Sequence, residues 1–156
     1  MIERWVGITV SGKKVTLVDA TVSSSGPITI NADQSCNLQE GDRPDAYSIM
    51  HQHISDYLRE NKIQRVVFKS SALTMGAMKK AHLEAAELRG VTMAAAASVA
   101  RTQSLAKAHI SRTFGNRKVD EYLKDDSFWS TELNGESVRI GSREAAMVLL
   151  AARELT

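Results

Sequence analysis

The sequence of 156 residues contains one cysteine and two prolines, and aromatic residues make up only 5% of it. Because Cys36 has no second cysteine to pair with, an internal disulfide and a cysteine-based zinc site are both excluded. We interpret Cys36 as a buried structural thiol. The scarcity of aromatic residues argues against a platform on which nucleic-acid bases stack, and we interpret Phe128 and Trp129 as packing residues.

Long hydrophobic runs are also missing. The longest apolar run covers residues 145–152, far short of the stretch of about 20 residues that crosses a bilayer. Residues 1–6 show no charged lead followed by a long apolar stretch, so no signal peptide is apparent. We therefore expect a cytoplasmic protein that does not interact with a membrane.

What the sequence does contain is typical of a globular protein. Apolar residues make up 43% of the chain and charged residues 24%. A chain of this length buries roughly 70% of its unfolded surface when it folds as one unit. We expect a single domain that spans residues 1–156.

The formal net charge of +2 hides a strong segregation of charge along the chain. Residues 61–119 hold eleven lysine and arginine residues but only two acids, Glu84 and Glu87, which gives this stretch a formal charge of +9. The rest of the chain carries −7. A basic half on a nearly neutral protein favours the binding of a polyanion, although such cations can also simply solvate helix faces.

Three strand-like stretches open the sequence, at residues 4–10, 14–20 and 28–32, and turn signals separate them. Their alternating apolar and polar residues predict an antiparallel meander. A helix should follow from Asp42 to Asn61, because Asp42 and Pro44 form a typical helix start. We then expect a strand at 63–68, a helix at 76–89 that ends at Gly90, and a fifth strand at 91–96.

Further helices are expected at residues 104–113 and 118–124. A closing helix should run from Ser142, a suitable cap, to Glu154. Because residues 145–152 are apolar on every side of that helix, it should be buried.

This order of elements and several short motifs resemble the RuvC-like branch of the ribonuclease H-like superfamily, which includes the Holliday-junction resolvases. The resemblance covers almost the whole chain and depends on the shared order of its motifs. They are VGITVSG (6–12), ELRGVTMAAA (87–96), the basic helix that ends RTFG (112–115) and the alanine-rich closing helix. It implies an α/β fold with a mixed five-stranded sheet, three antiparallel strands and then two parallel strands, flanked by helices.

The resemblance also implies where catalytic groups should be. Nucleases of this superfamily hold two divalent metals with carboxylates from the first strand, the fourth strand and the last helix. In this sequence the first-strand position is Thr9 and the fourth-strand position is near Lys69. Only Glu144 supplies an acid where the last helix should have one. We therefore expect degenerate catalytic positions, no resident metal and no other cofactor.

A lysine at the fourth-strand position would repel the cation that a carboxylate there should bind. We predict that the Lys69 ammonium instead pairs with Glu144, and a separation beyond about 6 Å would contradict this. Other acids could form a displaced metal site. They are Asp19, Glu84, Glu87, Asp120, Asp125 and Asp126. We interpret Glu84 and Glu87 as surface partners of Lys80 or His82, and Asp125 and Asp126 as helix-capping residues.

The histidines indicate little chemistry. His51 and His53 should point away from each other on one helix, and His109 is interpreted as an ordinary surface residue. The basic residues are more informative. Those predicted to contact nucleic acid are Lys79, Lys80, Arg101, Lys107, Arg112, Arg117 and Lys118. Phosphate contacts of this kind position a duplex without specifying its sequence.

Three hypotheses follow. The leading one is a RuvC-like domain that binds structured DNA, has lost metal-dependent nuclease activity and forms the homodimer that the resemblance implies. The second is an active nuclease with rearranged carboxylates, which would use Mg²⁺ or Mn²⁺. The third is a dimeric scaffold whose basic half contacts an acidic protein partner.

Overall fold

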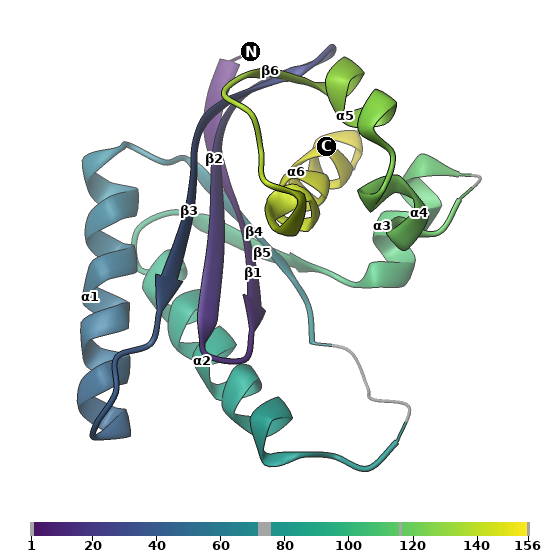
Figure 1. The fold of residues 1–156 in the computed structure, drawn as a ribbon. Helices are drawn as coiled ribbons and strands as arrows, with labels where there is room; N and C mark the ends of the chain where they lie inside the picture. Colours follow the sequence, from purple (N-terminus) through teal and green to yellow (C-terminus); the bar gives the residue numbers. More distant parts are fainter. Residues whose placement is uncertain (1, 72–75, 116, 156) are drawn as a thin grey trace.

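A computed structural model describes residues 2–71, 76–115 and 117–155 as a mixed sheet between two helical layers (Figure 1). The six-stranded sheet has the order β5-β4-β1-β2-β3-β6. Its strands are β1 (Ile2–Ser11), β2 (Lys14–Ser23), β3 (Ile28–Asn37), β4 (Arg65–Lys69), β5 (Arg101–Leu105) and β6 (Leu133–Gly135). The helices are α1 (Arg43–Glu60), α2 (Lys80–Ala97), α3 (Lys107–Phe114), α4 (Val119–Leu123), α5 (Asp126–Glu132), the short 3₁₀ helix η1 (Ile140–Ser142) and α6 (Arg143–Glu154).

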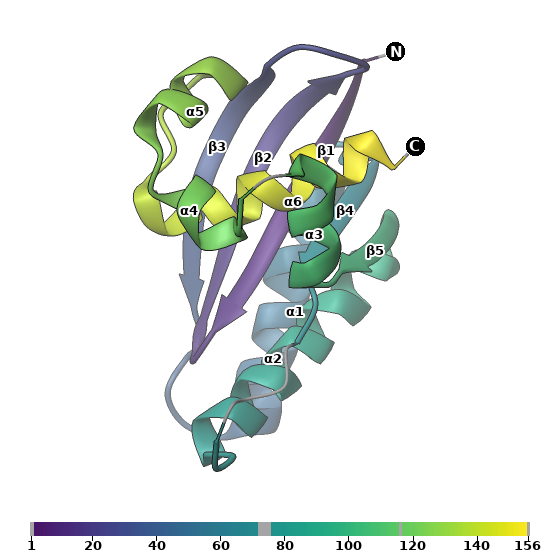
Figure 2. The same ribbon diagram turned by 90° about the vertical axis from the view of Figure 1, so that its right-hand side faces the viewer.

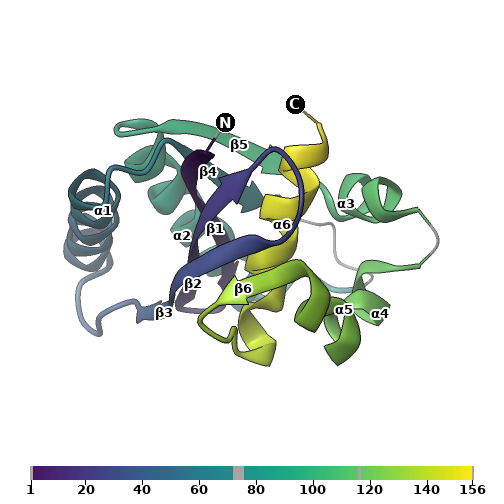
Figure 3. The same cartoon turned by 90° about the horizontal axis from the view of Figure 1, so that it is seen from above.

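The predicted antiparallel meander of β1, β2 and β3 is confirmed. β4 then pairs with β1 in parallel, and β5 pairs with β4 in parallel. Alternate residues of β1 enter different cores, since Trp5 packs in the core under α6 whereas Val6 and Ile8 pack in the core under α1 and α2. Figure 3 shows these two helical layers on opposite sides of the sheet.

The helix α1 begins as the sequence predicts. Asp42 is its N-cap, and the Asp42 carboxylate accepts a hydrogen bond from the backbone N–H of Asp45 at 3.3 Å. Pro44 lies in the first turn, where a missing N–H costs no helical hydrogen bond. The buried residues Met50, Ile54 and Leu58 recur at helical spacing and face the sheet.

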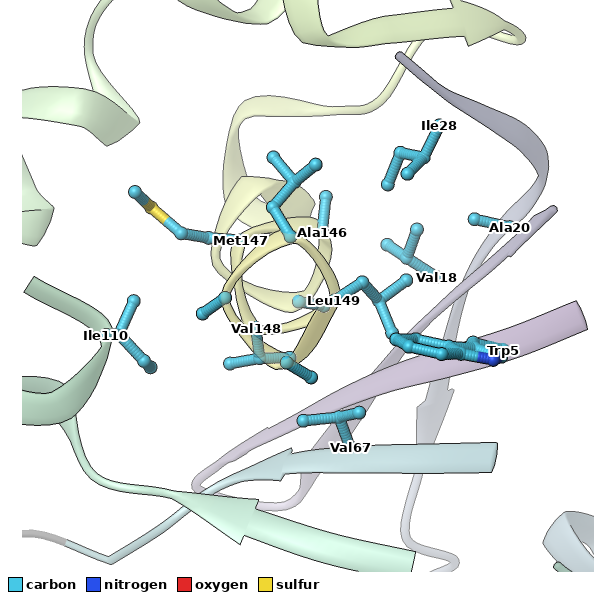
Figure 4. Close-up of a cluster of buried hydrophobic side chains, with 14 of the residues drawn as sticks. Trp5, Val18, Ala20, Ile28, Val67, Ile110, Ala146, Met147, Val148 and Leu149 are labelled. Carbon is cyan, nitrogen blue, oxygen red and sulfur yellow. The ribbon is translucent and has the colours of Figure 1, made fainter. Parts of the chain in front are cut away.

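The helix α6 crosses the opposite face of the sheet, as Figure 2 shows. Every residue from Ala145 to Ala152 is buried, which confirms the prediction for the closing helix. Figure 4 shows α6 surrounded by apolar side chains from the strands and from α3. A Cβ on Gly7 would lie 2.0 Å from the backbone oxygen of Ala145, so this glycine allows α6 to contact β1 directly.

The fifth strand was predicted in the wrong place. Residues 91–96, expected as a strand, belong to α2, which passes through Gly90 without a break. Alanine has the highest helix propensity, and the run of alanines at 94–97 outweighs one unfavourable glycine. The actual fifth strand is β5, a polar edge strand whose sequence, RTQSL, lacks the apolar alternation that signals a strand.

Other boundaries also differ. The helix expected from residue 104 begins at Lys107, because Ser104 and Leu105 still belong to β5. The prediction of five strands is wrong by one, since the three residues of β6 pair with β3 in parallel. β6 and α5 are too short to produce a periodic sequence signal. In the described part of the chain, no helix has the length and apolarity that a membrane span requires.

Candidate functional site

The three positions at which the resemblance places catalytic carboxylates converge on one cavity of about 430 Å³. Thr9 lies near the end of β1, Lys69 ends β4, and Glu144 lies in the first turn of α6. Because β1 and β4 are parallel neighbours, their ends meet at the same edge of the sheet. The cavity is lined by Thr9, Val10, Ser11, Lys14, Thr16, Lys69, Ser70, Arg89, Gly141 and Glu144. We call this cavity the cleft.

An ion pair lies inside the cleft. Lys69 Nζ donates a hydrogen bond to Glu144 Oε2 at 3.0 Å, and about a quarter of each side chain is exposed. The predicted pairing of Lys69 with Glu144 is therefore confirmed. The ammonium neutralises the cleft's carboxylate and occupies one of its oxygens.

Arg89 of α2 contributes a second cation that sequence reasoning did not assign to this place. Its Nη2 donates to the backbone oxygen of Val10 at 3.0 Å, and its Nη1 donates to Ser71 Oγ. Burial lowers the pKa of the Arg89 guanidinium. Among the residues that the structure describes, no carboxylate lies within ion-pair distance of it, and its buried Nε has no hydrogen-bond partner.

Lys14, at the start of β2, is the third cation of the cleft. It too has no ion-pair partner in the described ranges, whereas the adjacent Lys13 lies 4.0 Å from Glu40 and outside the cleft. Three cations and one carboxylate give the cleft a formal charge of +2. Hydroxyl groups complete its polar lining, and they come from Thr9, Ser11, Thr16 and Ser70.

A second set of contacts holds the start of α6 in place. Arg139 donates from Nε and Nη2 to the two carboxylate oxygens of Asp33 on β3, at 3.0 and 2.8 Å. The Ser142 hydroxyl donates to Asp33 Oδ1 at 2.6 Å, so this predicted cap binds a neighbouring strand and makes no side-chain cap hydrogen bond to α6. Burial opposes the charge of Asp33, but these hydrogen bonds prevail and lower the pKa of its carboxyl group. Glu144 is thereby fixed relative to the sheet.

The alternative acids are not gathered into one cluster in the part of the chain that the structure describes. No cluster of three or more His, Cys, Asp or Glu side chains occurs among the described residues. Arg43 pairs with Glu84 at 3.3 Å and with Glu87 at 3.0 Å, and Lys80 lies 3.7 Å from Glu84. The expected contact of Glu84 with Lys80 is confirmed, whereas Arg43, which pairs with both acids, was not predicted as a partner.

The remaining acids have structural roles. Asp125 caps α5 by accepting from the backbone N–H of Phe128 at 3.1 Å, which confirms the capping prediction. Asp19 is fully buried on β2, three residues beyond Thr16, and it binds Arg4 and Tyr57. Trp129 is 4% exposed, so its interpretation as a packing residue is confirmed.

Cys36 differs from the expectation of a buried thiol. It is half-buried, and its Sγ lies 3.3 Å from His53 Nε2 on α1. It is only half-buried because β6 pairs with residues 28–30 of β3, and no described strand covers this edge of β3 at Cys36. Burial nevertheless raises the pKa of the thiol, which disfavours a reactive thiolate.

The predicted nucleic-acid-binding residues fall into separate groups. Arg112, Arg117 and Lys118 line one surface cavity of about 270 Å³ at the end of α3. Lys107 is held by Asp120 at 3.2 Å, and Arg117 is held by Asp125 at 2.8 Å and stacks on Tyr122.

The other three are not part of this group. Lys79 and Lys80 lie at the start of α2. Arg101 begins β5 and pairs in register with Arg65, whereas Lys69 of the cleft pairs with Leu105 at the far end of that strand. The sequence placed these cations in one basic region, but their surface positions depend on the turns between the elements.

Comparison with solved structures places this arrangement among known folds. RuvC of Thermus thermophilus matches with a TM-score of 0.71 and 11% identity, over 99% of this chain and 95% of that chain. A structure of T. thermophilus RuvC in complex with Holliday junction substrate matches with a TM-score of 0.69 and 9% identity, over 99% and 94% of the two chains. The yeast mitochondrial Holliday junction resolvase Ydc2 matches with a TM-score of 0.64 and 14% identity, over 97% and 79%.

No protein-family model matches the sequence, and no curated protein sequence does so either. The structural matches define the class: the chain has the ribonuclease H-like fold. Within that class it has the RuvC-like form, which confirms the resemblance seen in the sequence at the level of the fold.

Proposed function

We propose that this protein binds structured DNA through the RuvC-like fold, has lost metal-dependent nuclease activity and acts as a homodimer. The observation that supports the loss of cleavage is the Lys69–Glu144 ion pair in the cleft. DNA binding is supported by the basic region of the chain and by the likeness to a RuvC whose structure is described as a complex with Holliday junction substrate.

The donor set of the cleft does not fit a pair of divalent metals. Mg²⁺ prefers hard, charged oxygen ligands, and Thr9 offers only a neutral hydroxyl. Glu144 is already neutralised by Lys69, whose ammonium adds repulsion of several kcal/mol toward a nearby cation if the site is partly dry. No catalytic step through a metal follows from these residues.

Replacing both unsuitable residues tests this reasoning directly. The variant Thr9→Asp/Lys69→Asp creates a three-carboxylate set with Glu144, and it should gain Mn²⁺ binding in isothermal titration calorimetry. The wild type should bind Mn²⁺ at least about tenfold more weakly, because it lacks two of the three charged ligands. Equal Mn²⁺ binding by both proteins, located at the cleft by its loss in Glu144→Ala, would contradict the proposal.

The DNA-binding half of the proposal rests on exposed cations. Arg112 near the end of α3 and Lys118, the N-cap residue of α4, are both exposed, and they share their surface cavity with Arg117. If five to eight phosphates are contacted, the logarithm of the affinity should fall against the logarithm of the salt concentration with a slope of about −4 to −7.

A labelled four-way junction in EDTA provides the measurement. Fluorescence anisotropy should show binding by the wild type and at least about tenfold weaker binding by Arg112→Glu/Lys118→Glu. Arg117 is left unchanged because it supports Tyr122 and Asp125. A control with a single charge reversal is Arg59→Glu on α1, an exposed cation of the opposite helical layer, and its loss should be compared per reversed charge. Equal loss in the control would contradict a specific surface.

Two further measurements address the alternatives. Incubation of junctions and RNA–DNA hybrids with Mg²⁺ or Mn²⁺ should leave them intact, and cleavage that Glu144→Ala abolishes would support an active nuclease instead. Sedimentation analysis should give the mass of two chains. A protein that is monomeric when it binds the junction would contradict the homodimer.

A further inference from the structure

We propose that the cleft is a direct phosphate-binding site, in which Lys14 and Arg89 hold the anion without a divalent metal. This inference deepens the proposed function and rests on it in one respect, since a DNA backbone is one source of such a phosphate. A free phosphate-bearing molecule is the other source, and its chemistry is the same.

The cleft keeps a net positive charge after its internal ion pair is formed. Lys69 and Glu144 neutralise each other at 3.0 Å, so neither contributes a net charge. Arg89 and Lys14 remain, and no carboxylate of the described residues lies within ion-pair distance of either. Two cations around one cavity without counter-charges favour an anion that brings its own negative charge.

The position of Arg89 is unfavourable for a cation. Its guanidinium is partly buried, its hydrogen bonds go to two neutral oxygens, and its Nε has no acceptor within the described part of the chain. Burial without a charged partner destabilises a cation, and the lowered pKa of Arg89 has that cause. An anion in the cleft would remove this penalty, and the planar guanidinium is suited to phosphate.

The polar lining of the cleft consists largely of hydroxyl groups. The hydroxyl groups of Thr9, Thr16 and Ser70 can each donate a hydrogen bond to an oxygen acceptor. The cavity of about 430 Å³ is much larger than the volume of roughly 30 Å³ that one water molecule occupies in the liquid. A tetrahedral oxyanion such as phosphate matches several hydroxyl donors together with two cations.

The test uses inorganic phosphate as the probe, in EDTA and at constant ionic strength set with chloride. Isothermal titration calorimetry should show binding by the wild type. Lys14→Gln should weaken it at least about fivefold, because even an exposed cation next to an anion contributes on the order of 1 kcal/mol. The matched control is Lys13→Gln, which removes the same charge one residue away and outside the cleft.

Glu144→Gln separates this proposal from a metal site by the sign of its effect. Without the carboxylate, Lys69 becomes a third unpaired cation, so phosphate should bind about threefold to tenfold more tightly. A metal site would lose its ligand and respond in the opposite direction. Because Glu144 is partly exposed on α6, the neutral isostere should keep the fold, and a circular dichroism melt checks this.

The four-way junction identifies the source of the phosphate. If the DNA backbone enters the cleft, Lys14→Gln should lower the steepness of the salt dependence by about 0.9 relative to Lys13→Gln. An unchanged slope together with weakened phosphate binding would support a free phosphate-bearing ligand.

The outcomes distinguish the two proposals. A wild type that fails to bind the junction would overturn the DNA-binding function but leave the phosphate titration as an independent test of the cleft. The direct phosphate site is overturned if phosphate binds no better than chloride, or if Lys14→Gln and Lys13→Gln behave alike.

Discussion

The charged residues near the two ends of β1 differ in whether they have partners of opposite charge. Near its start, Arg4 donates from Nε and Nη2 to the fully buried carboxylate of Asp19, at 2.9 and 2.8 Å. The Tyr57 hydroxyl donates to the same carboxylate at 2.7 Å. Burial and this hydrogen bond raise the pKa of Tyr57, while the hydrogen bond to Asp19 raises the pKa of Arg4.

Near the end of β1, the cleft contains cations that are not compensated in this way. Arg89 binds only neutral oxygens, and Lys14 has no ion-pair partner in the part of the chain that the structure describes. A buried charge that has all its partners therefore stabilises the fold. A charge left without a counter-ion is available to a ligand, and it has little role in stability.

The largest effect on stability should come from Gly7, which lies between these two regions. Gly7→Ala should lower the free energy of unfolding by about 3 kcal/mol, because the new Cβ meets the backbone oxygen of Ala145. The loss of hydrogen-exchange protection should be greatest in α6 and smaller in α1. Urea denaturation measures the change in the free energy of unfolding, and Gly90→Ala is the control.

Gly90 is a helical glycine with open space around it, so its replacement by alanine should stabilise the protein by about 0.5–1 kcal/mol. If both variants lost the same free energy of unfolding, the close approach of α6 to β1 would not be the reason for the lower stability of Gly7→Ala.

The second-largest loss of stability should come from the buried Asp19 carboxylate and its partners. Asp19→Asn should cost about 2 kcal/mol of unfolding free energy, since the amide cannot accept charge-assisted hydrogen bonds from Arg4 at both oxygens. Phosphate binding at the cleft should not change. Asp56→Asn on α1, which alters an exposed carboxylate, should cost almost nothing in the same urea titration. If Asp19→Asn left the free energy of unfolding unchanged, the Asp19 region would not stabilise the fold more than the cleft does.

Asp33 should give a smaller effect that depends on pH. Its carboxyl has a folded pKa below the usual value of about 3.9, so its contribution to stability is present above that value. It is lost as the pH falls through the folded pKa. Asp33→Asn should cost about 1 kcal/mol at pH 7 and progressively less toward pH 2, because the wild-type carboxyl takes up a proton as the pH falls through its folded pKa.

Urea melts at these two pH values measure the difference for Asp33. An equal cost at both pH values would show that Asp33 acts by packing alone.

The smallest effect on stability should belong to the cleft. Lys69→Met should change the free energy of unfolding by about 1 kcal/mol or less, because the ion pair with Glu144 is partly exposed. A loss of 3 kcal/mol or more in urea denaturation would show that the Lys69–Glu144 pair stabilises the fold, as Asp19 does. The cleft and the Asp19 region would then not differ in their contribution to stability.

Much of this fold could be predicted from local sequence signals. The alternation in β1 to β3, the Asp42 cap and the all-apolar surface of α6 each identified an element. Prediction failed at residues 91–105, where a glycine inside α2 resembled a helix end and the polar β5 showed no alternation. An edge strand can be polar because its stability comes from pairing with β4 more than from its own burial.

The site was predictable only in part. The pairing of Lys69 with Glu144 followed from family positions in two elements. Arg89 and Lys14 gave no such signal, since their place in the cleft depends on where α2 and the turn after β1 lie in space. The contact of Asp33 with Arg139 joins residues 106 positions apart, and no local pattern encodes it.

The contact of Gly7 with Ala145 has a consequence for biosynthesis. About 140 residues separate the first strand from the helix that covers it, which corresponds to roughly 7 to 28 s of translation at about 5 to 20 residues per second. During that interval the nascent chain must keep Trp5 and its apolar neighbours from aggregating without their final cover. Because α6 is synthesised long after β1, the core that α6 covers stays incomplete while the chain is still on the ribosome.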